Sequence, residues 1–103
     1  MKSFQFPLQR VMDWRALHLR AEEEKLGGLE RRLASLLHRD NALTAEQLKS
    51  ELGLLGLPSI EASDLRALAA FQLRIRNERV SLQHARAECE AQIAAQRQRL
   101  LQA

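Results

Sequence analysis

Apolar residues recur at helical spacing in the first third of the chain. Counted in alternating steps of four and three, positions 8, 12, 15, 19, 22, 26, 29, 33 and 36 form one row, in which only Arg15 and Glu22 are polar. This alternation puts a row on one helix face and is typical of a coiled-coil seam. It predicts a helix over about residues 7–38. The helix would begin near Pro7, because proline is tolerated in the first turn.

A second row follows later in the chain. Its apolar members are Leu68, Phe71, Ile75, Leu82, Cys89, Ile93 and Leu100, and the polar residues Arg79, Arg86 and Gln96 fill the remaining seam positions. No glycine or proline follows Pro58. We therefore expect a second helix over about 63–103, with Ser63 and Asp64 in its cap and first turn and Ser59 as the alternative cap.

The segment between the two rows contains turn-forming residues. Asp40 and Asn41 break the first pattern, and Thr44 to Gln47 have the form of a capping box. These features predict a tip over about 39–62 that holds a short helix and then a loop from Gly53 to Pro58. The leucines of this loop should pack on the helices or on a partner.

Two glycines, Gly27 and Gly28, lie inside the first predicted helix. Each costs about 1 kcal/mol relative to alanine in a helix interior. Either packing overrides this cost and the helix runs through, or the pair is a hinge.

Composition narrows the fold class. Ala, Leu, Glu, Arg and Lys make up 61 of the 103 residues, whereas Val, Ile and Thr contribute only six. The first figure is typical of long helices and the second disfavours a sheet. The sequence therefore predicts an all-α, single-domain protein. Its fold would be an elongated antiparallel two-helix coiled-coil hairpin with a short helical and looped tip.

Candidate chemistry is sparse. The three histidines lie apart from one another, and no catalytic, phosphate-binding or metal-ligand motif occurs. We expect no enzyme activity, no cofactor, no metal and no small-molecule substrate. An all-α chorismate-mutase-like enzyme would need a cluster of Lys and Arg that is missing. With neither an apolar span nor a signal sequence, and with only Cys89 as a thiol, a cytoplasmic location is expected.

The net charge of +3 raises the question of nucleic acid. The cations of residues 64–103 are mixed with acidic residues and spread around the predicted helix, whereas a basic-region helix concentrates them on one side. We expect no nucleic-acid binding, although a basic helical nucleic-acid module and a generic coiled-coil adaptor remain alternatives. Recognition of proteins through helix faces, including self-association, is the favoured class.

The first residues carry a family resemblance. The segment FQFPLQRVMDWR, Phe4 to Arg15, resembles the start of the flagellar export protein FliJ and its YscO-like type III secretion relatives. Leu65 to Ile75, with Phe71 followed by Leu and Arg, is similar to the start of the family's second helix. Family members have a longer second helix, so the chain is either a short member or a piece of a longer one.

The resemblance implies a stalk of the bacterial export apparatus that is peripherally associated with the inner membrane. Its partners would be the export ATPase ring, the export-gate membrane protein and export chaperones. The implied ATPase-binding residues are Phe4, Phe6, Leu8, Arg10, Val11 and Arg15, and the implied gate-binding residues are Phe71, Ile75 and Leu82. Two alternatives stay open. Phe4 and Phe6 could instead cover the open end of the hairpin, and the three gate residues could be ordinary seam residues.

Overall fold

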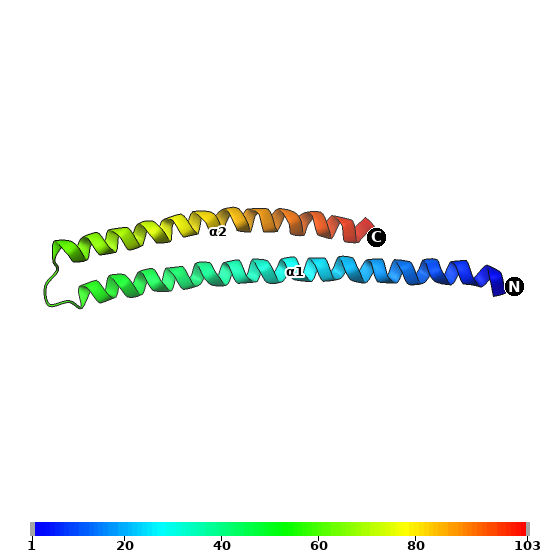
Figure 1. The fold of residues 1–103 in the computed structure, drawn as a ribbon, viewed down its shortest axis with the longest axis horizontal. Helices are drawn as coiled ribbons and strands as arrows, with labels where there is room; N and C mark the ends of the chain where they lie inside the picture. The colour runs from blue at the N-terminus through cyan, green and yellow to red at the C-terminus, as the bar shows by residue number, and fades with distance from the viewer. Residues whose placement is uncertain (1, 103) are drawn as a thin grey trace. The chain divides into compact units, whose positions relative to one another are not determined.

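Two helices make up the protein. The computed structural model describes the backbone of residues 2–102 and the side chains of residues 7–102. Helix α1 is Lys2–Leu55, helix α2 is Ala62–Gln102, and residues 56–61 connect them (Figure 1). The described residues contain no strand. The predicted all-α class is therefore confirmed.

Contacts group the described residues into two compact units. One joins the part of α1 up to Leu33 with the part of α2 from Cys89 on, and the other is Ala34–Glu88. The single-domain organisation stays a prediction.

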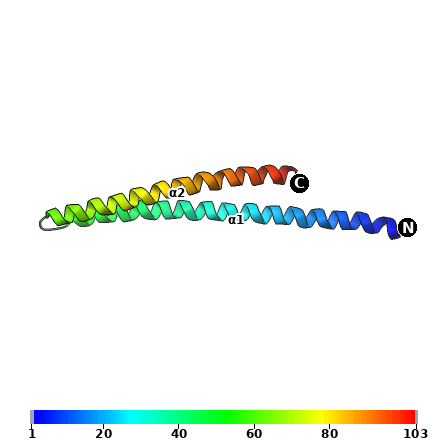
Figure 2. The ribbon, with the colours of Figure 1, turned by 45° about the horizontal axis from the view of Figure 1, so that its top comes forward.

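Each unit pairs a segment of α1 with a segment of α2 in antiparallel fashion. In the Ala34–Glu88 unit, Arg39 Nε donates to Glu78 Oε1 at 2.8 Å, and further along α1 Glu51 accepts from Gln72. The connecting loop joins the two segments at one end (Figures 1 and 2). In the other unit, Gln96 donates to Glu22, and Cys89 Sγ donates to Leu29 O at 3.3 Å. Partner numbers fall along α2 as they rise along α1, so the predicted hairpin pairing is confirmed.

The seam of α1 follows the predicted row and extends it. Residues 22, 26, 29, 33 and 36 are all buried or half-buried, as expected. The same alternation then continues through Asp40, Leu43, Gln47, Ser50 and Leu54, which are also buried or half-buried. On α2, the seven-residue series Leu68, Ile75, Leu82, Cys89 and Gln96 lies on the covered face.

The predicted end of the first helix at residue 38 was wrong, since α1 continues to Leu55. Leu43 is only 1% exposed, and Asp40 Oδ1 lies 3.8 Å from Arg79 Nε on α2. These tertiary contacts override the local preference of Asp40 and Asn41 for turns. Thr44 does not cap a new helix, because its hydroxyl donates to the backbone oxygen of Asp40 one turn earlier.

The tip is accordingly the short loop 56–61 and not the predicted 39–62. Helix α2 begins at Ala62, where the Asp64 carboxylate accepts the backbone N–H of Glu61 at 3.0 Å. This contact is one half of a capping box.

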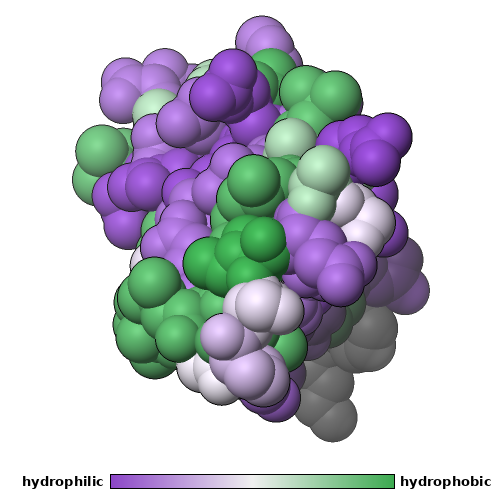
Figure 3. Space-filling view, turned by 90° about the vertical axis from the view of Figure 1, so that its left-hand side faces the viewer, coloured by the Kyte–Doolittle hydropathy of each residue, from purple (hydrophilic) through white to green (hydrophobic). Residues whose placement is uncertain are grey.

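Of the tip leucines that were expected to pack on the helices or on a partner, Leu54 is half-buried and three others do not pack on the helices. Leu52, Leu55 and Leu57 are 58%, 75% and 42% exposed. Figure 3, which faces this end, shows separate apolar areas among polar side chains.

The two interruptions inside α1 do not end it. Pro7 lies within the helix, which already begins at Lys2, and not at its start as predicted. Gly27 and Gly28 are also helical and half-buried, so the helix runs through the pair. A Cβ at Gly27 would meet Arg31 Nη1, a flexible side-chain end, at 3.4 Å. Packing against α2 therefore does not require glycine here.

Candidate protein-binding surface

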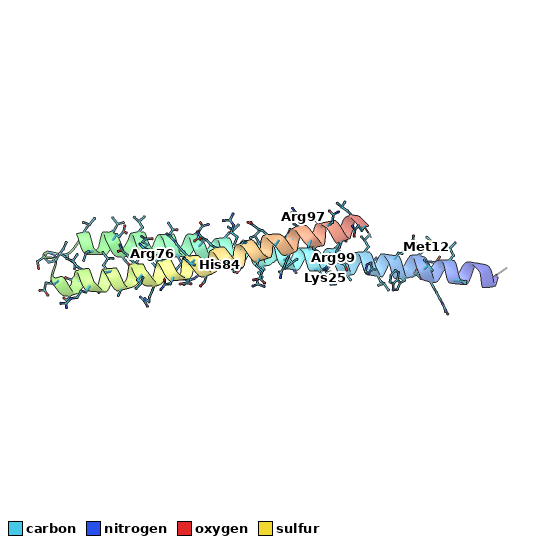
Figure 4. All side chains as sticks on the ribbon, turned by 90° about the horizontal axis from the view of Figure 1, so that it is seen from above. Met12, Lys25, Arg76, His84, Arg97 and Arg99 are labelled. Carbon is cyan, nitrogen blue, oxygen red and sulfur yellow. The ribbon has the colours of Figure 1, made fainter. Side chains whose placement is uncertain are left out.

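The N-terminal segment of α1, residues 7–21, is rich in exposed apolar side chains. Every one of its side chains is exposed. Its exposed large apolar residues are Leu8 (63%), Val11 (47%), Met12 (57%), Trp14 (63%), Leu17 (64%) and Leu19 (39%). In the unit that contains both chain ends, this segment continues past the end of α2 (Figures 1 and 2). Figure 4 shows Met12 on a part of α1 that α2 does not accompany. Large apolar patches of this kind mark interaction surfaces.

Leu8, Met12, Arg15 and Leu19 continue the seam of α1. They precede Glu22 and Leu26 in the same alternating steps of four and three that place residues 22–54 against α2. We call these four residues the uncovered seam. Its positions match those that α2 covers, and its four side chains are exposed.

The structure brings together only part of the predicted ATPase-binding set. At about 100° per residue, Leu8, Val11 and Arg15 lie on one side of the helix, whereas Arg10 lies on the other. The side chains of Phe4 and Phe6 lie outside the described side chains. Trp14 and His18 stack with ring centroids 5.2 Å apart, away from the uncovered seam.

The charged seam residues of α1 differ in their partners. Asp40 faces Arg79 of α2, and Glu22 accepts from Gln96 of α2. Arg15 makes no hydrogen bond or ion pair with any described residue. Among the described residues, the uncovered seam thus contains one guanidinium without an ionic partner, that of Arg15.

The paired seam is closed on its N-terminal side by a buried polar pair. Glu22 is 7% and Gln96 3% exposed, and the Gln96 amide donates to both the carboxylate and the backbone oxygen of Glu22. This hydrogen bond, helped by Lys25 and by His18, holds the pKa of Glu22 below its usual value against the effect of burial. In the sequence, Glu22 and Gln96 are polar interruptions of the two apolar rows. Each of them occupies a seam position in its own helix, and this is the feature of the sequence that indicates that they face each other.

The residues predicted to bind the export gate lie in the Ala34–Glu88 unit. Ile75 is 4% exposed, so its side chain belongs to the seam. Phe71 and Leu82 are half-buried. The Arg74 guanidinium lies 5.5 Å from the centre of the Phe71 ring, so one face of that ring contacts a cation. Only Phe71 and Leu82 therefore offer any surface to a partner.

Three arginines form ion pairs between α1 and α2. Arg39 pairs with Glu78, Arg79 with Asp40, and Arg97 Nη2 lies 3.7 Å from Glu30 Oε1. The hydrogen bond from Arg39 also lowers the pKa of Glu78. Cations engaged in this way are less available to phosphates.

Two negative findings apply to the described residues. No group of three or more His, Cys, Asp or Glu side chains is placed to hold a metal ion. Neither helix holds a stretch long and apolar enough to cross a membrane.

Comparison with known proteins adds no relative. No protein-family model, curated protein or solved structure matches the chain.

Proposed function

We propose that the chain is a non-enzymatic coiled-coil stalk of a bacterial flagellar or type III protein-export apparatus. In this role it contacts the export ATPase ring and the export gate and escorts export chaperones. It would work in the cytoplasm, peripherally associated with the inner-membrane machinery. The resemblance of Phe4 to Arg15 to the start of FliJ-like proteins supplies the identity of the partners. The two-helix hairpin is the fold that this resemblance implies.

One observation carries the binding role: apolar side chains are exposed beside arginine on an unaccompanied part of α1. Leu8 and Val11 are 63% and 47% exposed on the same side as Arg15. Apolar residues next to arginine are frequent among residues that dominate binding energy. We assign the ATPase contact to Leu8, Val11 and Arg15, with Phe4, Phe6 and Arg10 as further members of the set.

Co-purification with the export ATPase of the same bacterium tests this assignment. Arg15→Glu should weaken binding about tenfold or more, the loss that marks a dominant interface residue, whereas Arg10→Glu tests whether the other side of the helix also belongs to the contact. Arg20→Glu is the matched control, since it makes the same charge change on another side of the same segment. Equal binding by Arg15→Glu, Arg20→Glu and the unaltered chain would contradict the ATPase assignment. Absence of any export partner would favour a generic coiled-coil adaptor.

The gate contact is tested at Phe71. If its exposed part binds the gate, Phe71→Ala should reduce gate binding while the melting temperature changes by only a few degrees. If Phe71 acts mainly in packing, the same change should cost about 3–5 kcal/mol. Both quantities are measured on one variant, and a large fall in melting temperature would remove Phe71 from the gate-binding set.

A further inference from the structure

The seam of the Ala34–Glu88 unit has two sides of different chemistry. On one side, the Arg39 guanidinium pairs with Glu78 and lies 3.7 Å from Glu46, so charges there meet within the chain. Thr44 and Arg79 lie on the other side, about 140° and 100° around their helices from Arg39 and Glu78. A groove of about 450 Å³ opens on this second side.

Both helices line this groove, and all of its lining residues are described, so its opening does not depend on either end of the chain. Its floor includes Ile75, which is 4% exposed. Four of its residues follow one another along α2 in steps of four, three and four, which places them in one row beside the seam. None of the lining residues is acidic. The polar lining consists of Gln47, Gln72, Arg76, Arg79 and Gln83.

Exposed apolar side chains border the groove on both helices. On α1, Leu48 and Leu55 are 56% and 75% exposed, and they alternate with Thr44 and Glu51 in one row of three- and four-residue steps. On α2, Val80 lines the groove and is 48% exposed. Such rows match the side-chain rows of another helix, and apolar residues on both sides of a groove are typical of sites that bind an amphipathic helix.

Arg79 is held at the wall of the groove. Its Nη2 donates to Thr44 Oγ1 at 2.5 Å, whereas its Nε is buried, lies 3.8 Å from Asp40 Oδ1 and makes no hydrogen bond with any described residue. A buried donor without an acceptor costs free energy and calls for an explanation. The described chain therefore satisfies this guanidinium only in part.

Arg76, one turn before Arg79, makes no hydrogen bond or ion pair with any described residue. It is exposed on the part of α2 that runs beside α1 (Figure 4). The two carboxylates that contact groove residues are already engaged, Asp40 by Arg79 and Glu51 by two glutamines of the lining. The charge that remains unmet in the groove is therefore positive.

A glutamate side chain matches these features. A guanidinium binds a carboxylate through paired N–H donors, and the methylene groups of glutamate can pack on Ile75 and Val80. The glutamine amides offer further donors and acceptors. A phosphate group carries up to two negative charges, which would lie close to Asp40, and it has no apolar part to place against the rim.

A second copy of the chain matches less well. In a symmetric pairing of this face with itself, Arg76 and Arg79 of both copies would enter one interface. The carboxylates of the same face, Asp40 and Glu51, already have partners within the chain. Like charges brought together in an interface weaken binding.

We propose that this groove binds an amphipathic helix of a partner protein, which places a glutamate carboxylate against Arg76 and Arg79 and apolar residues against Leu48, Leu55 and Val80. The inference goes beyond the export role, since these five residues belong to neither the ATPase-binding nor the gate-binding set.

Three synthetic helical peptides test the inference on the full chain. Each has three heptads with leucines along one face, and two positions one turn apart on that face are both glutamate, both glutamine or both lysine. Binding is measured by fluorescence anisotropy of the labelled peptide. The glutamate peptide should bind about tenfold more tightly than the glutamine peptide, and the lysine peptide should bind most weakly. Equal affinities, or no binding of the glutamate peptide, would overturn the inference.

Two arginines of α2 provide a matched pair of variants. Arg76 and Arg74 are both exposed, and two residues place them about 200° apart on the helix, so only Arg76 lies in the groove. Arg76→Glu should weaken the glutamate peptide about tenfold or more and reverse the preference in favour of the lysine peptide. Arg74→Glu should leave both affinities unchanged. Because position 76 is exposed, the melting temperature should stay within a few degrees. An unchanged preference in Arg76→Glu would overturn the contact between the carboxylate and Arg76.

Competition and sedimentation separate the other occupants. If inorganic phosphate displaces the glutamate peptide more effectively than glutarate does, the groove is a phosphate site and the inference fails. If the unaltered chain sediments as a dimer that Arg76→Glu converts to a monomer, a second copy is the occupant and the inference also fails.

The export proposal is tested by different residues. Arg15→Glu should lose the ATPase and still bind the glutamate peptide with unchanged affinity. Loss of the peptide by Arg15→Glu would overturn the location of the site in the groove. Unaltered ATPase binding by Arg15→Glu would contradict only the ATPase assignment, so the two proposals fail separately.

Discussion

At the scale of single residues, the buried contact between Glu22 and Gln96 should be especially sensitive to substitution. A carboxylate is enclosed by a seam and satisfied by one amide, so removal of the amide leaves a buried charge with only the marginal contact of Lys25 at 3.5 Å. We expect Gln96→Leu to lower the melting temperature by about 5 °C or more. The double variant with Glu22→Leu should recover most of the loss, because two apolar residues can replace a buried polar pair. Circular dichroism melting of the unaltered chain, the two single variants and the double variant checks this. A double variant as unstable as Gln96→Leu would contradict it.

The same carboxylate predicts a pH dependence. The pKa values of Glu22 and Glu78 are lowered in the folded chain, so the unfolded chain binds more protons at acidic pH. Their stabilising contribution is present above the unfolded value near 4.5 and is lost as the pH falls through the lower folded values. We expect the melting temperature to fall below about pH 4.5, and Glu22→Gln to reduce that fall. Glu23→Gln, an exposed neighbour, is the control and should not reduce it.

At the scale of the helix, α1 carries glycines that its backbone does not need. Gly53 is helical and has no positive φ, and a Cβ there would meet nothing within 4 Å. Gly53→Ala should therefore stabilise the chain by about 0.5–1 kcal/mol, which raises the melting temperature by a few degrees. Gly56→Ala, outside the helix, should give a smaller gain. Destabilisation by Gly53→Ala would mean that the end of α1 has a different conformation.

The continuity of α1 also shows why the sequence pattern did not predict the full length of this helix. The part of the row from Leu26 to Leu36 was predicted correctly because its members are leucines. The row beyond it was missed because Asp40, Gln47 and Ser50 are polar, although they keep the same phase. Hydropathy alone cannot distinguish such positions from a turn. What keeps them helical is tertiary: the burial of Leu43 and the ion pair of Asp40 with Arg79.

At the scale of the whole molecule, few side chains are fully enclosed. Among the described residues, the buried apolar ones are Leu43, Ile75, Cys89 and Ile93. Leu43→Ala should cost about 2–5 kcal/mol, a large part of the stability of a small chain. Because α1 runs without a break from one unit into the other, hydrogen exchange should accelerate in both units. Leu48→Ala, at a 56% exposed position, is the control. Acceleration confined to residues 34–88 would show that the two units open independently.

The features that were predicted correctly depend on periodicity within one helix, and the features that were missed depend on contacts between the helices. The helix content, the antiparallel pairing and the seam of Leu26 to Leu36 depend on periodicity, which one sequence displays. The division of the predicted ATPase set between two sides of α1 follows from helix geometry alone, because residues 8–15 lie within the helix predicted over 7–38. The burial of Ile75 and the missing partner of Arg15 depend on where α2 lies. No pattern in α1 alone contains that information.

Cys89 makes the pairing of the helices measurable without any added label. It is the one thiol of the chain, it is 1% exposed, and its Sγ donates to the backbone of the opposite helix at Leu29. A thiol reagent can reach it only while α1 and α2 separate locally, so the rate of alkylation reports the free energy of that opening. A partner that binds next to this unit and stabilises the closed form should slow the reaction. The alkylation rate of Cys89 in the native chain therefore measures how each variant and each candidate partner changes the free energy of this local opening.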